Sequence, residues 1–155
     1  MADIKLFRVD ERLIHGQIIA SWLNKINIDT IIVANNKAVN NELQKSLFKL
    51  AVPSYVNLKI LSIDQVDQYL KSTNEKIMLI TGDLESTYEL IKNGLMVTEI
   101  NIGNISQKKN KKQVCKSVWI DDNDFNYIKK LNNNGIKLNV QSIPTDKKRN
   151  LIDLI

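Results

Sequence analysis

The stretch RVDERLIHGQ, residues 8–17, gathers most of the chain's scarcest polar side chains. It holds the only histidine, His15, and two of the three arginines, Arg8 and Arg12. Guanidinium groups bind phosphate oxygens in a fork that lysine cannot reproduce. A neutral imidazole beside them is a nucleophile, and its attack on a phosphoryl group gives a phosphohistidine. These residue types therefore predict a phosphate site in which His15 accepts the phosphoryl group and the arginines neutralise its charge.

His15 stands where an expected strand gives way to an expected helix. The residues up to Val9 read as a strand, and a helical pattern of apolar residues starts at Gly16 or Gln17. Unpaired backbone N–H groups and the helix dipole favour an anion there, so we expect Gly16 and Gln17 to help bind the phosphate. Asp10 can hydrogen-bond the second ring nitrogen of His15 and fix its tautomer, or it can orient an arginine. The sequence leaves both roles open.

Short β-branched runs alternate with longer segments of helical spacing along the chain. Strands are predicted at 4–9, 29–34, 57–61, 76–81, 98–103, 116–120 and 137–143, and helices at 16–25, 40–52, 62–72, 84–94 and 121–135, with a short last helix from Thr145. Such alternation implies βαβ units and a doubly wound α/β fold, an open, mostly parallel sheet with helices on both faces. We expect residues 1–155 to form one domain.

The predicted helices carry local signals at their ends and on their faces. Ser62 or Asp64 can cap the start of helix 62–72, and Gly94 and Gly135 stand where the glycine after a helix end belongs. In helix 40–52, the leucines share one side and are expected to be buried: Leu43, Leu47 and Leu50.

Two further loops are expected beside His15. Ligands of open parallel sheets bind beyond the carboxyl ends of the strands. The strand ending at residue 81 leads into Thr81, Gly82 and Asp83, which offer a hydroxyl and helix-start amides, and the strand ending at 103 contributes Gly103. We take these four residues as candidate phosphate-binding residues. Ordinary turn chemistry explains them equally well.

Composition argues against several other kinds of site. The net charge is +5, but it comes mostly from dispersed lysines, and aromatic residues make up only 6% of the chain, a pattern unlike a nucleic-acid surface. One histidine and one cysteine form no metal-ligand cluster, so no metal is expected. No cofactor is expected either, because the first βα turn lacks the glycine-rich signatures of NAD- and ATP-binding folds. A serine-hydrolase G-x-S-x-G elbow is also absent.

The chain is expected to be soluble and cytoplasmic. Its longest apolar runs, TIIVA and IMLIT, are too short to cross a bilayer, and the N-terminus lacks the segments of a secretory signal. The single cysteine, Cys115, cannot form an internal disulfide. The densest charge is the lysine run KKNKK at 108–112, which is either an exposed loop or a docking surface for an acidic partner protein.

The residues RVDERLIHGQIIASW resemble the opening signature R-[IV]-D-x-R-L-[IL]-H-G-Q-[VI] of the IIB component of the mannose/fructose/sorbose-type sugar phosphotransferase system (PTS). The likeness continues through IIVANN, KLAVP, IMLITGDLESTYELIKNG, EINIG and VWIDDNDFNYIKKLNNNGIKLNVQSIPTD, nearly the whole chain. It implies a cytoplasmic phosphocarrier, a protein-Npi-phosphohistidine–sugar phosphotransferase. His15 would receive a phosphoryl group from a phosphohistidine of the IIA protein and pass it to a sugar held by the membrane components IIC and IID, without metal or nucleotide.

One position departs from the family pattern. Where the family commonly has a glycine pair after the fifth strand, this chain has Gly103 followed by Asn104. Asparagine tolerates a left-handed backbone better than most residues, so we expect the turn to survive. The lysine-rich segment that follows is this chain's own.

Two other interpretations stay open. A non-enzymatic phosphate- or nucleotide-binding regulatory module of the same fold would hold an anion with the arginines, and His15 would lend only a hydrogen bond. An interaction subunit without chemistry would do neither, and the arginines and acids around His15 would then be an exposed ion-pair cluster of little energetic weight.

Overall fold

The computed structural model describes residues 1–155. Its elements are β1 (Asp3–Asp10), α1 (Gly16–Leu23), β2 (Thr30–Ala34), η1 (Ala38–Asn40), α2 (Glu42–Ala51), β3 (Asn57–Leu61), α3 (Ile63–Ser72), β4 (Lys76–Thr81), α4 (Leu84–Lys92), β5 (Glu99–Asn104), β6 (Lys112–Cys115), β7 (Val118–Ile120), α5 (Asp122–Asn133), β8 (Lys137–Val140), β9 (Arg149–Asn150) and η2 (Leu151–Leu154). No helix has both the length and the apolar character needed to cross a membrane.

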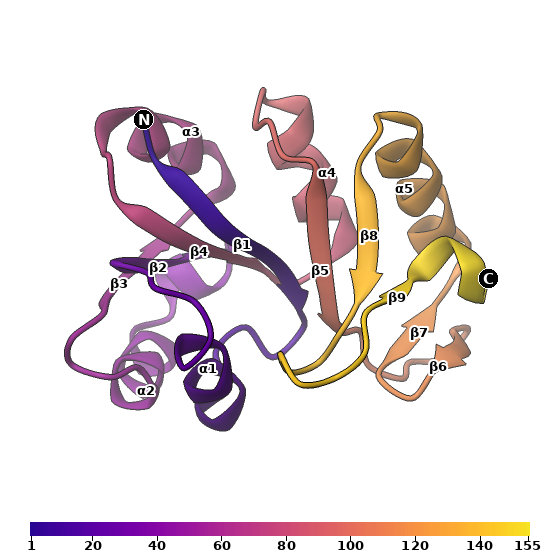
Figure 1. The fold of residues 1–155 in the computed structure, drawn as a ribbon, viewed down its shortest axis with the longest axis horizontal. Coiled ribbons are helices and arrows are strands. Elements are labelled where there is room, and N and C mark those ends of the chain that lie inside the picture. Colours follow the sequence, from indigo (N-terminus) through magenta and orange to yellow (C-terminus); the bar gives the residue numbers. More distant parts are fainter.

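Seven strands form one sheet in the order β3-β2-β4-β1-β5-β8-β9, in which β9 alone runs antiparallel to its neighbour. Helices α1 and α2 pack on one face, and α3, α4 and α5 pack on the other (Figure 1). The doubly wound, mostly parallel α/β fold predicted from the sequence is confirmed.

Strand β1 lies in the middle of the sheet, between β4 and β5. The chain leaves β1 for α1 on one face, whereas β4 and β5 lead to helices on the other face (Figure 1). Such a reversal opens a crevice at the carboxyl ends of the strands, where open α/β sheets bind their ligands. The β1–α1 loop, residues 11–15, lies at this point of the sheet.

Two apolar cores fill the two sides of the sheet. The larger has 21 buried residues under α3, α4 and α5, and the smaller has 13 under α1 and α2. Successive side chains of a strand alternate between the cores, as Ile32 in the larger core and Ile31 and Val33 in the smaller one show. Strands covered on both faces read as continuous apolar runs, which is why TIIVA and IMLI stood out in the sequence.

The helix ends agree with the predicted signals. Ser62 is the N-cap of α3, and its backbone N–H donates to the side chain of Gln65 at 2.9 Å, so of the two predicted caps Ser62 is the one used. Gly94 and Gly135 follow α4 and α5 with φ of +110° and +77°. These left-handed angles favour glycine, as expected for residues just past a helix end.

The predicted burial of the α2 leucines is wrong. Their exposed fractions are 72% for Leu43, 55% for Leu47 and 85% for Leu50, and the buried side chain of α2 is Phe48. The leucines do share one side of the helix, but the larger aromatic ring lies on nearly the opposite side and makes the contact with the sheet.

The predicted helix from Thr145 is also wrong. Residues 141–148 form turns in which the side-chain amide of Gln141 donates to the backbone carbonyls of Pro144 and Asp146, at 3.1 and 2.9 Å. The chain then adds the short antiparallel strand β9 and the 3₁₀ helix η2, where Leu151 is fully buried. Side-chain contacts with the loop backbone and this apolar anchor replace a helical ladder.

The predicted strand at 116–120 lies outside the main sheet. Its residues 118–120 form β7, which pairs antiparallel with β6 as a separate hairpin, and a single bridge between Val118 and Ile105 joins it to the end of β5. The segment that the sequence predicted as a basic loop therefore includes the strand β6 from Lys112 onward.

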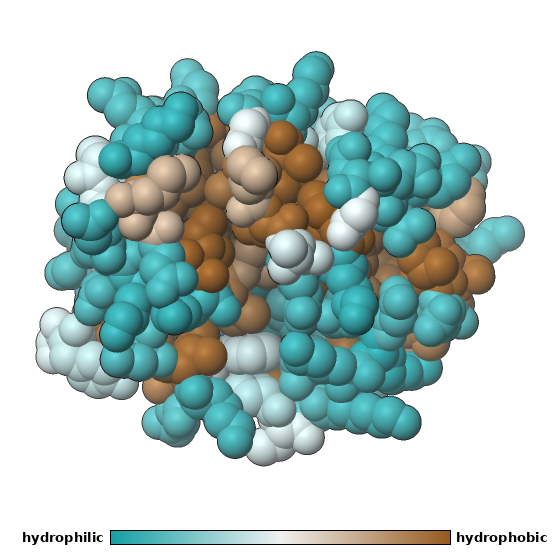
Figure 2. All heavy atoms as spheres, turned by 45° about the horizontal axis from the view of Figure 1, so that its top comes forward, coloured by the Kyte–Doolittle hydropathy of each residue, from teal (hydrophilic) through white to brown (hydrophobic).

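The sheet is split at its amino-terminal edge. β1 pairs with β5 only from Arg8 to Asp10, whereas its residues 3–7 pair with β4 alone. A cleft of about 710 Å³ lies between β1 and β5 at this edge. Figure 2 shows apolar residues gathered in the hollow of this edge, between two more polar halves of the surface. The cleft lies at the edge opposite to the β1–α1 loop.

We predict that Phe48→Ala lowers the free energy of unfolding by about 3–5 kcal/mol, because it deletes a buried aromatic side chain and leaves a cavity. Leu47→Ala in the same helix is the control and should change it by no more than about 0.5 kcal/mol, since Leu47 is exposed. Urea unfolding followed by circular dichroism measures both. A larger loss for Leu47→Ala than for Phe48→Ala would contradict this placement of α2.

Candidate functional site

The β1–α1 loop turns apolar side chains inward and polar side chains outward. Leu13 and Ile14 are buried in the smaller core, whereas Arg12 and His15 are exposed. Leu13 has φ of +62°, a left-handed angle that residues other than glycine rarely adopt, and its N–H donates to the carbonyl of Asp10 at 2.9 Å. Burial of Leu13 holds this strained turn closed, and the turn presents Arg12 and His15 at the surface.

His15 is the N-cap residue of α1, in an extended conformation with φ −128° and ψ 115°. Its carbonyl accepts a helical hydrogen bond from Ile19 at 2.9 Å, while its exposed imidazole has no hydrogen-bond partner. No side chain caps the first amides of α1, those of Gly16 and Gln17 among them, and no acidic residue lies in its first turn. A nucleophilic ring nitrogen and uncapped helix amides therefore meet at one exposed point.

Asp10 holds both arginines of the motif. Its Oδ2 accepts hydrogen bonds from Nη2 of Arg8 and Nη2 of Arg12, each at 3.0 Å. Its Oδ1 accepts from the side-chain Nε and the backbone N–H of Arg12, also at 3.0 Å. Of the two roles that the sequence left open, Asp10 therefore orients an arginine and does not bond to His15. Asp10 thus binds Nε and Nη2 of Arg12, whereas Nη1 has no hydrogen-bond partner on this side chain, which is 39% exposed.

Arg8 is buried beneath the loop. Its Nη1 donates to Oδ1 of Asn101 at 2.7 Å and to the backbone carbonyl of Gln141 at 3.2 Å, and its guanidinium lies 5.8 Å from the ring centre of Trp22. Burial lowers the pKa of the Arg8 guanidinium, and the ion pair with Asp10 opposes that shift. The structure thus brings Arg8 to Asp10 but not to the surface, where Arg12 and His15 are exposed.

Gly103 provides the space for the Arg8 guanidinium. A Cβ atom at residue 103 would overlap Cζ and Nη2 of Arg8 and lie 2.6 Å from Nη1. A glycine is therefore needed here for a buried arginine, a different reason from the phosphate contact expected from the sequence. Asn104 is not left-handed, and its carbonyl accepts from the N–H of Glu11 at 3.0 Å, which ties the end of β5 to the β1–α1 loop.

The loop after β4 reaches the site through Gly82. A Cβ atom at residue 82 would lie 3.3 Å from Cδ2 of Leu13, so this backbone packs against the β1–α1 loop. The buried hydroxyl of Thr81 bonds to the hydroxyl of Thr87 at 2.7 Å, and the carboxylate of Asp83 caps α4 by accepting a backbone N–H at 2.7 Å. The polar groups of Thr81 and Asp83 thus serve their own helix.

The lysine segment, residues 108–112, lies beside the same loop. Glu11 forms an ion pair with Lys108 at 2.5 Å and accepts the N–H of Ser106 at 3.1 Å. Burial raises the pKa of the Glu11 carboxyl, but these partners outweigh burial and hold its pKa below the usual value. The hydrogen bond to Glu11 likewise raises the pKa of Lys108.

The remaining lysines of the segment differ in their pairing. Lys111 forms an ion pair with Asp124 of α5 at 2.9 Å. Lys109 and Lys112 have no acidic side chain within ion-pair distance and are exposed. Of the four lysines of the segment, two are thus paired and two carry unpaired positive charge, and the first of the four contacts the β1–α1 loop.

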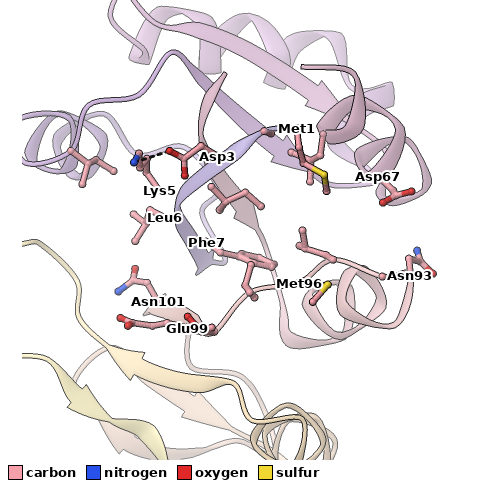
Figure 3. Close-up of a pocket in the computed structure, with 18 of the residues that line it drawn as sticks. Met1, Asp3, Lys5, Leu6, Phe7, Asp67, Asn93, Met96, Glu99 and Asn101 are labelled. Carbon is pink, nitrogen blue, oxygen red and sulfur yellow. Dashed lines mark ion pairs between the residues drawn. The ribbon is translucent and has the colours of Figure 1, made fainter. Parts of the chain in front are cut away.

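The cleft at the amino-terminal edge of the sheet extends to the residues that bond to Arg8. Figure 3 shows the residues that line it from β1, such as Phe7, and from β5, such as Glu99 and Asn101. Asn101 and Gln141, the two partners of Arg8 Nη1, both line the cleft. This cleft thus lies on the far side of Arg8 and not at His15.

Sequence reasoning missed Asn101 and Gln141 as parts of the site. Asn101 had a signal, because it is a polar residue inside the strand EINIGN, whose neighbours are buried and apolar. Gln141 contributes its backbone carbonyl to Arg8, and a backbone contact leaves no trace in residue type. No group of three or more histidine, cysteine or acidic side chains is arranged to hold a metal ion.

Comparison with known proteins agrees with this fold. A family profile described as "PTS system sorbose subfamily IIB component" matches residues 4–155. The chain therefore belongs to the sorbose-subfamily IIB components of the sugar phosphotransferase system, and the resemblance seen in the sequence is confirmed.

Two curated relatives illustrate the match. The chain is 30% identical over 152 residues to the sorbose-specific EIIB component of Lacticaseibacillus casei, with 96% of this chain and 93% of that protein covered. It is 31% identical over 155 residues to the mannose-specific EIIAB component of Escherichia coli K12, with 98% of this chain and 48% of that protein covered. The chain thus spans about half the length of the mannose-specific relative.

Solved structures of this kind share the fold over nearly the whole chain. The IIBSor domain of the sorbose permease from Klebsiella pneumoniae superposes with a TM-score of 0.93 at 26% identity, covering 98% of this chain and 95% of that one. An N-acetyl-galactosamine IIB component from Streptococcus pyogenes gives a TM-score of 0.92 at 30% identity, covering 99% and 98%.

We predict that Gly103→Ala lowers the free energy of unfolding by about 1–3 kcal/mol, because the new Cβ displaces the buried Arg8 guanidinium. Gly16→Ala is the matched control. Its Cβ would lie 3.8 Å from that of Ala51, an ordinary contact, so the cost should stay below about 0.5 kcal/mol. Thermal and urea unfolding compare the two variants. Equal stabilities would show that Arg8 does not need the space above Gly103.

Proposed function

We propose that this chain is a phosphocarrier of sugar uptake, acting as a protein-Npi-phosphohistidine–sugar phosphotransferase. His15 accepts a phosphoryl group from a phosphohistidine of the IIA protein and passes it to a sugar held by the membrane components IIC and IID. One observation carries the proposal: the imidazole of His15 is exposed and unpaired at the uncapped start of α1. Membership of the sorbose-subfamily IIB components supports the reaction class.

The residues around His15 have separate tasks in this transfer. Phosphoryl transfer is mostly a matter of positioning and of charge stabilisation. The amides of Gly16 and Gln17 and the free Nη1 of Arg12 receive the charge on the phosphoryl oxygens. Asp10 fixes Arg12 before the partner arrives, so little reorganisation is needed at the moment of transfer.

The proposed place of action is the cytoplasm, at the inner face of the membrane where IIC and IID lie. An exposed imidazole suits a carrier because two partners must reach the same nitrogen in turn. The relatives bear the names of sorbose, mannose and N-acetylgalactosamine, so we propose a hexose or a hexose derivative as the sugar.

Labelling from a phosphorylated cognate IIA protein tests the proposal. We expect one phosphoryl group per chain, labile in acid and stable in base, as a phosphohistidine is. His15→Ala should take up none and should unfold like the parent, since the exposed ring contributes little to the core. A regulatory module that only binds phosphate would release all label on denaturation. Label retained by His15→Ala would contradict the assignment of the acceptor.

We predict that Arg12→Lys slows transfer from the IIA protein by about tenfold or more while leaving the free energy of unfolding within about 1 kcal/mol of the parent. A planar fork held by Asp10 becomes a mobile point charge. Arg149→Lys, which changes the exposed third arginine on β9, is the control and should transfer at the parent rate. Rapid-quench kinetics measures the three proteins. Equal rates for both variants would show that Arg12 does not contact the phosphoryl group.

A further inference from the structure

Helix α2 carries a row of exposed apolar side chains that the fold does not use. Leu43, Leu47 and Leu50 are 72%, 55% and 85% exposed and make up three of the eight large exposed hydrophobic residues of the chain. Others lie singly or at the termini, whereas these three share one side of a ten-residue helix. Contiguous exposed apolar surface of this kind is typical of an interaction site. We call these three residues the leucine stripe.

The leucine stripe leads to His15. Residues 43, 47 and 51 follow one another at intervals of four, so they lie in one row along α2. Ala51 at the end of this row is the residue that a Cβ on Gly16 would meet, at 3.8 Å. Gly16 directly follows His15, and Figure 1 shows α1 and α2 next to each other below the sheet. The end of α2 that carries Leu47 and Leu50 therefore lies beside the N-terminus of α1.

The lysine segment borders the β1–α1 loop through a different contact. Lys108 is tied to Glu11 of this loop, and the neighbouring Lys109 and Lys112 have no acidic partner. The β1–α1 loop, which carries His15, thus contacts the lysine segment at Glu11, and Gly16, the residue after this loop, lies beside the end of α2.

We propose that the leucine stripe, together with the lysine segment, is the surface on which the phosphohistidine donor protein docks. The inference rests on the proposed function, because only a carrier of phosphoryl groups needs such a donor. A histidine on a protein surface reaches His15 only if the donor's surface covers the residues around it. The apolar row and the free lysines therefore fit a donor face that is apolar in part and acidic in part.

Charge favours the donor protein, rather than the membrane component, as the partner that binds this surface. The donor arrives with a phosphoryl dianion, which the lysine segment and Arg12 attract before contact. The sugar acceptor is a neutral molecule held inside another protein, and free lysines add nothing to its approach. Burial of the leucines then holds the complex together once the charges have aligned it.

The transfer on this surface needs no further reactant. The lone pair of a neutral His15 nitrogen forms a bond to phosphorus while the N–P bond of the donor breaks, and that electron pair returns to the donor ring. The donor ring carries a proton on its second nitrogen and leaves as neutral imidazole. His15 keeps the proton on its own second nitrogen and becomes a phosphoryl-imidazolium, so protons and charge balance.

A variant with Leu43→Gln, Leu47→Gln and Leu50→Gln tests the proposal. Glutamine keeps a similar length and a good helix propensity, so α2 should persist. Leu50→Gln alone, at the most exposed of the three positions, is a second variant that cannot disturb the core. Met96→Gln is the matched control, because Met96 is 91% exposed and lines the cleft at the opposite edge of the sheet.

Two phosphoryl donors distinguish docking from chemistry. Phosphorylated IIA protein must dock, whereas phosphoramidate is a small phosphoryl donor that needs no protein surface. We expect the triple variant to lose at least tenfold in the second-order rate constant with IIA, about 1.4 kcal/mol, and Leu50→Gln to lose part of this. Labelling by phosphoramidate should match the parent in both variants, and Met96→Gln should match the parent with both donors.

Each contrary result has a separate meaning. Parent rates with IIA for the triple variant would overturn the docking proposal and leave the phosphocarrier function standing. Parent rates with IIA combined with slow delivery to the sugar would assign the leucine stripe to the membrane component and overturn the choice of occupant. A parent chain labelled by neither donor would overturn the phosphocarrier function and, with it, this inference.

Discussion

The buried ion pair between Arg8 and Asp10 is the constraint on which the site depends. Both side chains are only 1% exposed, and a charge at that depth is costly unless it is paired and hydrogen-bonded. Removing one partner of such a pair costs about 3–5 kcal/mol, so neither group is free to move away from the other. The same carboxylate makes three hydrogen bonds to Arg12. The buried ion pair thus preorganises Arg12 at the surface, three residues before His15 in the same loop.

The ion pair also accounts for features of β5, the strand next to β1. Gly103 must lack a Cβ atom because the Arg8 guanidinium occupies that space, and Asn101 is polar inside an apolar strand because it accepts from Arg8. β1 and β5 pair only from Arg8 to Asp10 and separate into the cleft beyond. The Arg8–Asp10 ion pair therefore lies in the short stretch where β1 and β5 pair and join the two parts of the sheet. Asn101 and Gln141, which accept hydrogen bonds from Arg8, line the cleft.

Much of the fold could be predicted from the sequence because the apolar runs of the strands and the helical spacing of apolar residues were both clear. Runs such as TIIVA and IMLI alternate with well-capped helices, and the helix caps at Ser62, Gly94 and Gly135 all appear. The predictions failed where tertiary contacts decide the outcome. The spacing of the α2 leucines shows that they share a side of the helix, but not that Phe48 makes the contact with the sheet.

For the site, the residue types identified the correct loop, but they do not show how deeply each side chain is buried. Arg8 lies in the predicted strand 4–9 and Arg12 in the loop after it, but residue type alone does not show that Arg8 supports Asp10 whereas Arg12 reaches the surface.

Three features of the β1–α1 loop, α1 and α2 depart from the usual preferences for backbone angles, helix caps and burial. Leu13 adopts a left-handed backbone angle, α1 begins without a side-chain cap, and α2 leaves its leucines in water. Each departure costs some stability; unlike α1, the helices α2, α4 and α5 are capped by side chains at their first turns. Sequences that agree with their fold at every other level violate such rules mainly where function requires it. Open amides suit an arriving anion and exposed leucines suit an arriving protein, so their shared location points to one event, the approach of a charged macromolecular partner to the imidazole.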